Sequence, residues 1–297
     1  MKGRFLGALV VLWACSAQAQ SVSGSFFATQ DSDDFRESKQ TLGYATGAGW
    51  GVRAGALHYT APGWSASGSL AAATYKQINK NRTVDASLGT ARVAGTSYWV
   101  GALDYMEHLN PATAVGLSLE RDLVNSIRGI DGGVHFTALA AVLDHAFNEQ
   151  FNVGIAAGTA LFSNDNQRPI LRTRWNYSIS ERYGINAYVR TRSYHNTNAY
   201  RPEYFSPERL REASAGLSSR FEVAQAFVLS ASIDAGQQRI DGASDPIWRG
   251  TLGIASRRNS ALQWFLGIEA SNTAPLFAGR TGSYRYTSAT GRVSVPF

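Results

Sequence analysis

The chain has 297 residues, 28 Lys and Arg against 22 Asp and Glu, and 44% hydrophobic residues, so it can build one large domain and is neither a disordered nor a collagenous chain. Only four basic residues are Lys and the 24 Arg are scattered, so a net charge of +6 gives no reason to expect a nucleic-acid partner. The single Cys excludes a disulfide framework, and beyond the leader no apolar run is long enough for a membrane-spanning helix.

The first 19 residues have the layout of an export signal. Lys2 and Arg4 precede an apolar run over residues 5–14, and Ala17-Gln18-Ala19 is typical of a cleavage site between small residues. The run is about half the roughly 20 residues of a membrane-spanning helix. We therefore expect a signal peptide over residues 1–19 and a mature domain over 20–297. Lipidation of Cys15 is an alternative, although bulky Trp13 fits such a site poorly.

From residue 21 onward, apolar and polar residues alternate with the two-residue period of β-strands, and helical periodicity is weak. Most of the segments reach the roughly 9 to 11 residues that a tilted strand needs to cross a bilayer. We expect about sixteen strands, over residues 21–30, 40–48, 52–60, 65–77, 83–93, 98–107, 113–123, 134–145, 152–162, 170–179, 185–194, 212–221, 226–235, 247–256, 262–270 and 283–297.

The lengths of the predicted connections favour a membrane barrel over a soluble sandwich, which would show the same alternation. Segments 124–133, 163–169, 195–211, 236–246 and 271–282 are long, whereas 146–151, 180–184, 222–225 and 257–261 are short. Long external loops and short periplasmic turns characterise outer-membrane barrels. We therefore expect an all-β, transmembrane, antiparallel up-and-down barrel of about sixteen strands in the cell outer membrane, in contact with its lipid.

The last predicted strand ends in an aromatic residue, with two valines on the same face. Val293, Val295 and Phe297 form this pattern, which resembles the signal by which bacterial barrels are passed to the barrel-assembly machinery. Pairing of this strand with the first would close the sheet and leave no hydrogen-bonding edge in lipid. We therefore expect these three residues to act as an assembly signal and the assembly machinery to be a partner.

Alternation also predicts which residues face the barrel interior. If Leu171 and Trp175 face lipid, Arg172 and Arg174 face the lumen, because a lipid-facing charge at mid-depth costs about 2 to 4 kcal/mol. The next strand adds Asn186, Tyr188, Arg190 and Arg192 on one face, and acidic candidates on other strands are Glu120, Asp122, Asp234 and Glu269. Such a lining could bind hydrated, sugar-like solutes. Ion pairs that simply fill the barrel are an equally weighted alternative.

The long predicted loop over residues 195–211 is rich in Tyr, Pro, Asn and Arg and could fold over the barrel mouth. Its Tyr200, Tyr204 and Phe205 would suit the faces of carbohydrate rings. A loop packed by its own aromatic side chains is at least as good an interpretation.

Two short segments, Asp31-Ser32-Asp33-Asp34-Phe35 and Tyr204-Phe205-Ser206-Pro207, resemble parts of the barrel domains of exopolysaccharide-export outer-membrane proteins. These are the cellulose and poly-N-acetylglucosamine exporters, together with small barrel-only relatives. The resemblance implies a sixteen-stranded barrel that passes a growing polysaccharide. Such exporters usually carry a helical-repeat region before the barrel, so either a separate periplasmic repeat protein supplies that function here or this barrel does something else.

Catalytic motifs are absent from the sequence. His58, His108, His135, His145 and His195 stand in no nucleophile, metal or phosphate-binding motif. Asp31, Asp33, Asp34 and Glu37 form an acidic cluster without the spacing of a calcium loop. We expect no enzyme activity, no metal and no cofactor. The leading hypothesis is a passive conduit for a polysaccharide or oligosaccharide, and the alternative is a non-conducting structural or surface-recognition barrel.

Overall fold

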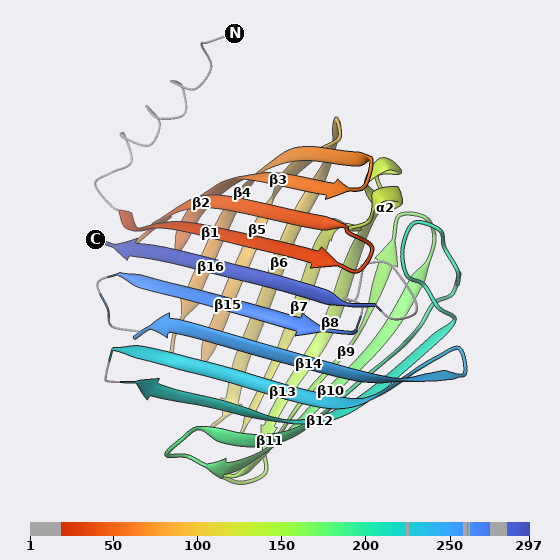
Figure 1. Ribbon diagram of the computed structural model, residues 1–297. Coiled ribbons are helices and arrows are strands. Elements are labelled where there is room, and N and C mark those ends of the chain that lie inside the picture. Colours follow the sequence, from red (N-terminus) through yellow and green to blue (C-terminus); the bar gives the residue numbers. More distant parts are fainter. Residues whose placement is uncertain (1–18, 224–225, 258–259, 261, 274–283) are drawn as a thin grey trace.

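The computed structural model describes residues 19–223, 226–257, 260, 262–273 and 284–297, and within them the chain forms a closed antiparallel barrel (Figure 1). The predicted signal peptide and Cys15 lie almost entirely outside the described residues. The strands are β1 (Ala19–Asp31), β2 (Arg36–Thr46), β3 (Trp50–Ala61), β4 (Trp64–Ile78), β5 (Arg82–Val93), β6 (Thr96–Asn110), β7 (Thr113–Leu123), β8 (His135–Ala146), β9 (Phe151–Phe162), β10 (Gln167–Ser180), β11 (Ile185–His195), β12 (Arg209–Val223), β13 (Phe227–Ile240), β14 (Ala243–Ser256), β15 (Gln263–Ser271) and β16 (Tyr286–Pro296).

The barrel closes through its first and last strands. β1 pairs with β16 in an uninterrupted antiparallel register from Ser21 opposite Pro296 to Asp31 opposite Tyr286. Every strand therefore has two hydrogen-bonded neighbours, and no strand edge is left to face lipid. This confirms the expected all-β barrel of sixteen strands. No helix among the described residues has the length and hydropathy needed to cross a bilayer.

The strand register carries one face of each strand to the same side of the wall. Arg172 stands opposite Arg192, which stands opposite Glu212, and all three line an internal cavity. Leu171 and Trp175 lie on the other face of β10 and are exposed on the outside of the barrel. Because these outward side chains are apolar, the outer surface of the wall suits contact with the hydrocarbon of a membrane.

Two of the long connections predicted at the loop-bearing end are short in the structure. Segment 236–246 is not a long loop: β13 and β14 continue pairing to Ile240 opposite Ala243, joined by Asp241 and Gly242 alone. Both have positive φ, 49° and 98°, as the tight hairpin turn favoured by an Asp-Gly pair requires. Many of the residues around Pro246 are polar, so in the sequence both strands look shorter than they are in the structure. The predicted loop 163–169 likewise shrinks to 163–166, because β10 begins at Gln167.

The connection between β7 and β8 contains the short helix α2 (Ile127–Asp131), which lies at the loop-bearing end of the barrel (Figure 1). Ser126 caps it by accepting a hydrogen bond from the Gly129 N–H. Ile130 packs into a buried apolar cluster that draws its residues from β3 to β7. The cluster consists of Leu57, Tyr59, Ala66, Ala91, Val93, Tyr98 and Leu123. The helix thus fills one side of the barrel mouth.

Candidate functional site in the barrel lumen

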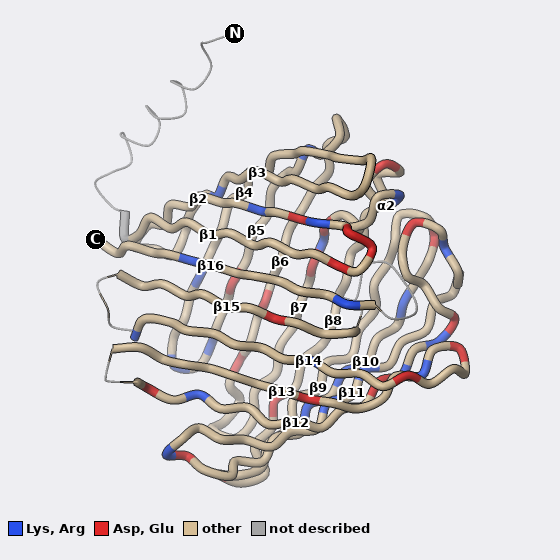
Figure 2. Tube along the Cα trace, viewed as in Figure 1, with Lys and Arg blue, Asp and Glu red and all other residues tan. Residues whose placement is uncertain are grey.

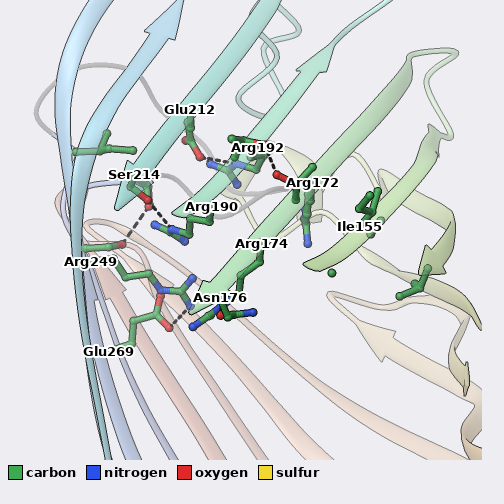
Figure 3. Close-up of a pocket in the computed structure, with 18 of the residues that line it drawn as sticks. Ile155, Arg172, Arg174, Asn176, Arg190, Arg192, Glu212, Ser214, Arg249 and Glu269 are labelled. Atoms are coloured by element: carbon green, nitrogen blue, oxygen red, sulfur yellow. Dashed lines mark hydrogen bonds and ion pairs between the residues drawn. The ribbon is translucent and has the colours of Figure 1, made fainter. Parts of the chain in front are cut away.

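The largest of three cavities along the barrel lumen, of about 750 Å³, lies against the wall formed by β8 to β12 and β14 to β16. Charged residues recur along the strands of this barrel as well as in its loops (Figure 2). Side chains from neighbouring strands converge on the cavity (Figure 3). Its charged lining consists of Arg172, Arg174, Arg190, Arg192, Arg249, Asp144, Glu212 and Glu269. Basic groups therefore outnumber acidic ones on this wall.

The two arginines of β11 are neutralised by acids on the next strands. Arg190 forms an ion pair of 2.9 Å with Asp234, which is almost fully buried. Arg192 donates two hydrogen bonds to the Glu212 carboxylate, at 2.7 and 2.5 Å. A bidentate arginine–carboxylate pair of this kind holds both planes in one orientation. These two arginines are fixed parts of the wall.

Two of the three arginines of β10, Arg172 and Arg174, have no such partner. Arg172 and Arg174 stand directly opposite Arg192 and Arg190, and neither forms an ion pair with a described residue. Arg174 donates to the Asn176 Oδ1 at 2.9 Å, and its guanidinium lies 4.0 Å from the centre of the Tyr188 ring. Both are exposed to the lumen, so their donors remain available to a solute.

Arg249, on β14, was not identified from the sequence. It forms an ion pair of 2.7 Å with Glu269 on β15. The signal was present, because Arg249 is flanked by Trp248 and Gly250 in an alternating segment whose other face is apolar. Glu269 was predicted to face the lumen, but its partner was not.

The next cavity along the lumen, toward the mouth, has a volume of only about 250 Å³, and we refer to it as the constriction. Lys39 on β2 reaches Asp122 on β7 at 3.4 Å and Glu37 at 2.9 Å. Because β2 and β7 are not neighbours in the sheet, the Lys39–Asp122 pair crosses the barrel interior. Glu120 also lines this constriction. Neither Lys39 nor the pairing of Glu37 was expected from the sequence.

A third cavity, of about 620 Å³, lies at the mouth between α2 and the loop over residues 196–208. It shares Asp31, Phe35 and Asn125 with the constriction, which in turn shares Phe27 and Tyr286 with the largest cavity. The three cavities therefore form one series along the lumen. Charged side chains line each of the three cavities, together with apolar and aromatic ones.

The aromatic residues of the loop over 196–208 separate into two groups. Tyr204 and Phe205 are 4% and 8% exposed, and the Tyr204 ring stacks on Phe162 at 4.3 Å between ring centres. Burial raises the pKa of the Tyr204 hydroxyl. Tyr200 is 70% exposed, and its hydrogen bond to the Asp241 carboxylate raises its pKa. Only Tyr200 presents a free ring to an external ligand.

Arg168 falls within the predicted loop 163–169, but in the structure it belongs to β10 and anchors the loop over 196–208. It is fully buried and donates to the Asn196 Oδ1 at 2.8 Å and the Phe205 carbonyl at 2.7 Å. Its guanidinium also lies within 4.6 to 5.6 Å of three ring centres, those of Phe162, Tyr194 and Tyr204.

The remaining predicted residues lie as follows. Tyr188 is buried and donates to Asp234 at 2.9 Å, and Asn186 donates to the Gly184 carbonyl at 3.0 Å beside the turn between β10 and β11. Val293, Val295 and Phe297 are exposed on the outward side. In the acidic cluster, Asp31 accepts from the backbone of Asp33 and Phe35, and the described residues hold no group of three or more metal-binding side chains.

The histidines do not meet carboxylates in the part of the chain that the structure describes. His58 lies 3.0 Å from the Ser67 hydroxyl, His145 lies 3.0 Å from that of Thr113, and His135 lies 3.2 Å from the Gly133 carbonyl. The Ser67–His58 pair faces outward and has no acidic residue to orient the ring.

The fold has solved counterparts, although no known protein family and no curated protein matches the sequence. A bacterial polysaccharide outer membrane secretin superposes with a TM-score of 0.72 at 15% identity, over 93% of this chain and 98% of that one. CdiB from Acinetobacter baumannii superposes with a TM-score of 0.52 at 9% identity, over 92% of this chain and 60% of that one. At these identities the likeness concerns the fold. The chain has the fold of an outer-membrane β-barrel, in agreement with the location expected from its sequence.

Proposed function

We propose that this barrel is a passive conduit of the outer membrane for a polysaccharide or oligosaccharide. The observation that carries the proposal is the series of three cavities, each lined in part by charged side chains, with Arg172 and Arg174, which form no ion pair with a described residue, on the wall of the largest one. A guanidinium that keeps free donors can exchange hydrogen bonds with successive hydroxyl or carboxylate groups of a moving sugar chain. No bond is made or broken in this role.

The choice of a saccharide as cargo draws on two supports. The Arg174 guanidinium, 4.0 Å from the centre of the buried Tyr188 ring, offers hydrogen-bond donors to the lumen, which suits the hydroxyl-bearing edges of sugar rings. The solved polysaccharide secretin has the same fold. Export of a long chain would further involve a separate periplasmic repeat protein as partner, and insertion would use the barrel-assembly machinery acting on Val293, Val295 and Phe297.

Conductance across a planar bilayer tests the conduit. The purified barrel should carry a steady current, and added oligosaccharides should interrupt it. Arg174→Glu should change the ion selectivity and shorten the interruptions, because it replaces an unpaired lumen cation by an anion. The matched control is Arg182→Glu, the same charge change in the turn between β10 and β11. Absence of current in the folded protein would refute the conduit.

The second candidate is a barrel that conducts nothing and binds a partner through its loops. The observation in its favour is the packed mouth, where α2 and the buried Tyr204 and Phe205 occupy the lumen end, above the Lys39–Asp122 pair that crosses the interior. In this case Arg172 and Arg174 would be parts of the barrel wall and would bind no solute. The same bilayer measurement separates the two functions.

A further inference from the structure

The outward face of the barrel carries a basic rim at the end that bears the long loops. The outward-facing arginines near that end are Arg36, Arg92, Arg121, Arg209, Arg211 and Arg239, as the strand registers place them. At the opposite end the described strands present Arg82 and Glu107 outward. On the described strands, no Asp or Glu faces outward at the loop-bearing end. The outside of the wall is therefore electrically asymmetric.

The rim is densest on β12 and β13. Arg211 and Arg239 are directly opposite each other in the register, and both are exposed. Side chains in such a pair start from β-carbons about 4.5 to 5.5 Å apart, and like charges there destabilise a sheet. Arg209, one outward position above Arg211, faces His195. Three guanidinium groups thus share one small area.

None of these three arginines is neutralised by a described acid. Arg239 donates to the Gly242 carbonyl at 3.3 Å, a neutral group. Two acidic residues, Asp241 and Glu208, lie in the connections at this end. The Asp241 carboxylate is engaged by the backbone N–H groups of Glu208 and Arg209 and by the Tyr200 hydroxyl. Glu208 lies in the loop and not on the outward face of a strand.

Arg211 and Arg239 lie at the depth along the barrel where the boundary of the membrane is expected. Below Arg211, the outward positions of β12 are small or apolar down to Val223, with Ser219 the exception. Eleven residues at about 3.3 Å each, tilted by about 40°, span close to the 25 Å apolar band of an outer-membrane barrel. Arg211 and Arg239 therefore lie where hydrocarbon gives way to the lipid headgroups of the outer leaflet.

We propose that Arg211 and Arg239, with Arg209, bind the phosphate groups of a phosphorylated glycolipid in the outer leaflet. A phosphate accepts bidentate hydrogen bonds from guanidinium groups, and basic residues at a membrane surface bind anionic lipids. A lipid phosphate between the two side chains would cancel their repulsion while its acyl chains lie on the apolar wall below. The inference requires the loop-bearing end to face outward and does not depend on conduction through the lumen.

Binding of lipid A by the purified barrel in detergent tests the site. Diphosphorylated lipid A is titrated against the wild-type chain and against the double variant Arg211→Gln/Arg239→Gln. We expect the double variant to bind about 30-fold more weakly, from two arginines at a headgroup boundary. The matched control is Arg53→Gln/Arg220→Gln, which removes two charges on the inward faces of β3 and β12 and should leave lipid affinity unchanged.

Two further arms decide the source of the phosphate and the state of the variant. Lipid A stripped of both phosphates should bind the wild type as weakly as it binds the double variant; equal binding of the two lipids to the wild type would overturn the proposal. Displacement of the lipid by millimolar inorganic phosphate would instead indicate a free-phosphate site and would also overturn it. Without lipid, the double variant should unfold no more easily than the wild type, because a repulsive pair has been removed.

Discussion

Arg168 and Arg172 lie four residues apart on the same face of the same strand, yet they belong to two different kinds of interior. Arg168, at the mouth, is fully buried among Phe162, Tyr194 and Tyr204 and bonded to the loop over 196–208. Arg172, in mid-barrel, is open to the cavity and has no ion-pair partner among the described residues.

The difference shows that the inner wall of this barrel is a core at one level and a pore lining at another. Inward alternation places an arginine inside, but the loops decide whether it is covered. Where α2 and the loop over 196–208 fold inward, apolar inner residues become packed clusters. Where no loop reaches, the inner wall stays exposed to the cavity and carries charged groups. Substitutions at the two levels should therefore have opposite consequences for stability and transport.

The largest effect should come from Arg168→Ala. The change removes two charge-assisted hydrogen bonds and leaves the buried Asn196 amide and Phe205 carbonyl short of donors, at a cost of about 3 to 5 kcal/mol. We expect the loop over 196–208 to open and to be cut by added protease far faster than in the wild type. Cleavage rates of the folded barrel in detergent measure this.

The matched substitution is Arg172→Ala on the same strand. It removes a lumen-exposed cation with no ion pair to lose, so it should change the free energy of unfolding by less than about 1 kcal/mol and leave the loop protected. A loop that opened equally in both variants would show that the mouth and mid-barrel are not distinct regions.

An intermediate effect is expected from Lys39→Met at the boundary between the two regions. The variant leaves Glu37, which is 5% exposed, and Asp122 without their shared cation, which we expect to destabilise the barrel by about 2 kcal/mol. If the pair sets the narrowest cross-section, single-channel conductance should rise. The measurements are unfolding in denaturant and current across a planar bilayer.

Lys76→Met provides the comparison for that variant. The Lys76–Asp85 pair has a similar distance, 3.0 Å, but its side chains are 55% and 54% exposed, so its loss should cost at most about 1 kcal/mol. An unchanged current in Lys39→Met, with the protein still folded, would place the constriction elsewhere.

The wall of the barrel could be predicted because it depends on local alternation. The strand over residues 113–123 was predicted with the bounds that the structure has. Arg172 and Arg174 share the inward face of β10, and Arg190 and Arg192 that of β11, because the two members of each pair are two positions apart. Such patterns need no knowledge of distant contacts. Strand ends were harder, and the Asp241-Gly242 turn was overlooked although its residue types indicate a tight hairpin.

The contents of the lumen could not be predicted in the same way. Lys39 and Asp122 are 83 residues apart and meet only because the sheet closes. The helix α2 spans five residues, too few to give a periodic signal, and its position depends on the cavity into which Ile130 fits. Arg168 looked like a loop residue because Pro169 follows it, and its burial depends on the fold of a different loop.

The smallest effect concerns the pH dependence of the packed mouth. The Tyr204 hydroxyl donates to the Asn164 Oδ1 and accepts from the Asn166 Nδ2, both at 3.0 Å. Because burial raises its pKa above the ordinary value of 10.0, the folded loop holds the proton more tightly than the open loop does. Its contribution to stability is complete below about pH 10 and is lost as pH rises through the folded pKa.

Protease cleavage of the loop should therefore accelerate above about pH 10 in the wild type, beyond the change in the protease's own rate on an unfolded substrate. Tyr204→Phe keeps the ring stacked on Phe162 and removes the titrating group. It should cost about 1 kcal/mol at neutral pH through the lost hydrogen bonds, and its cleavage should lack the alkaline step. An identical step in the variant would assign it to another group, with Tyr284 the first to test, because burial raises its pKa as well.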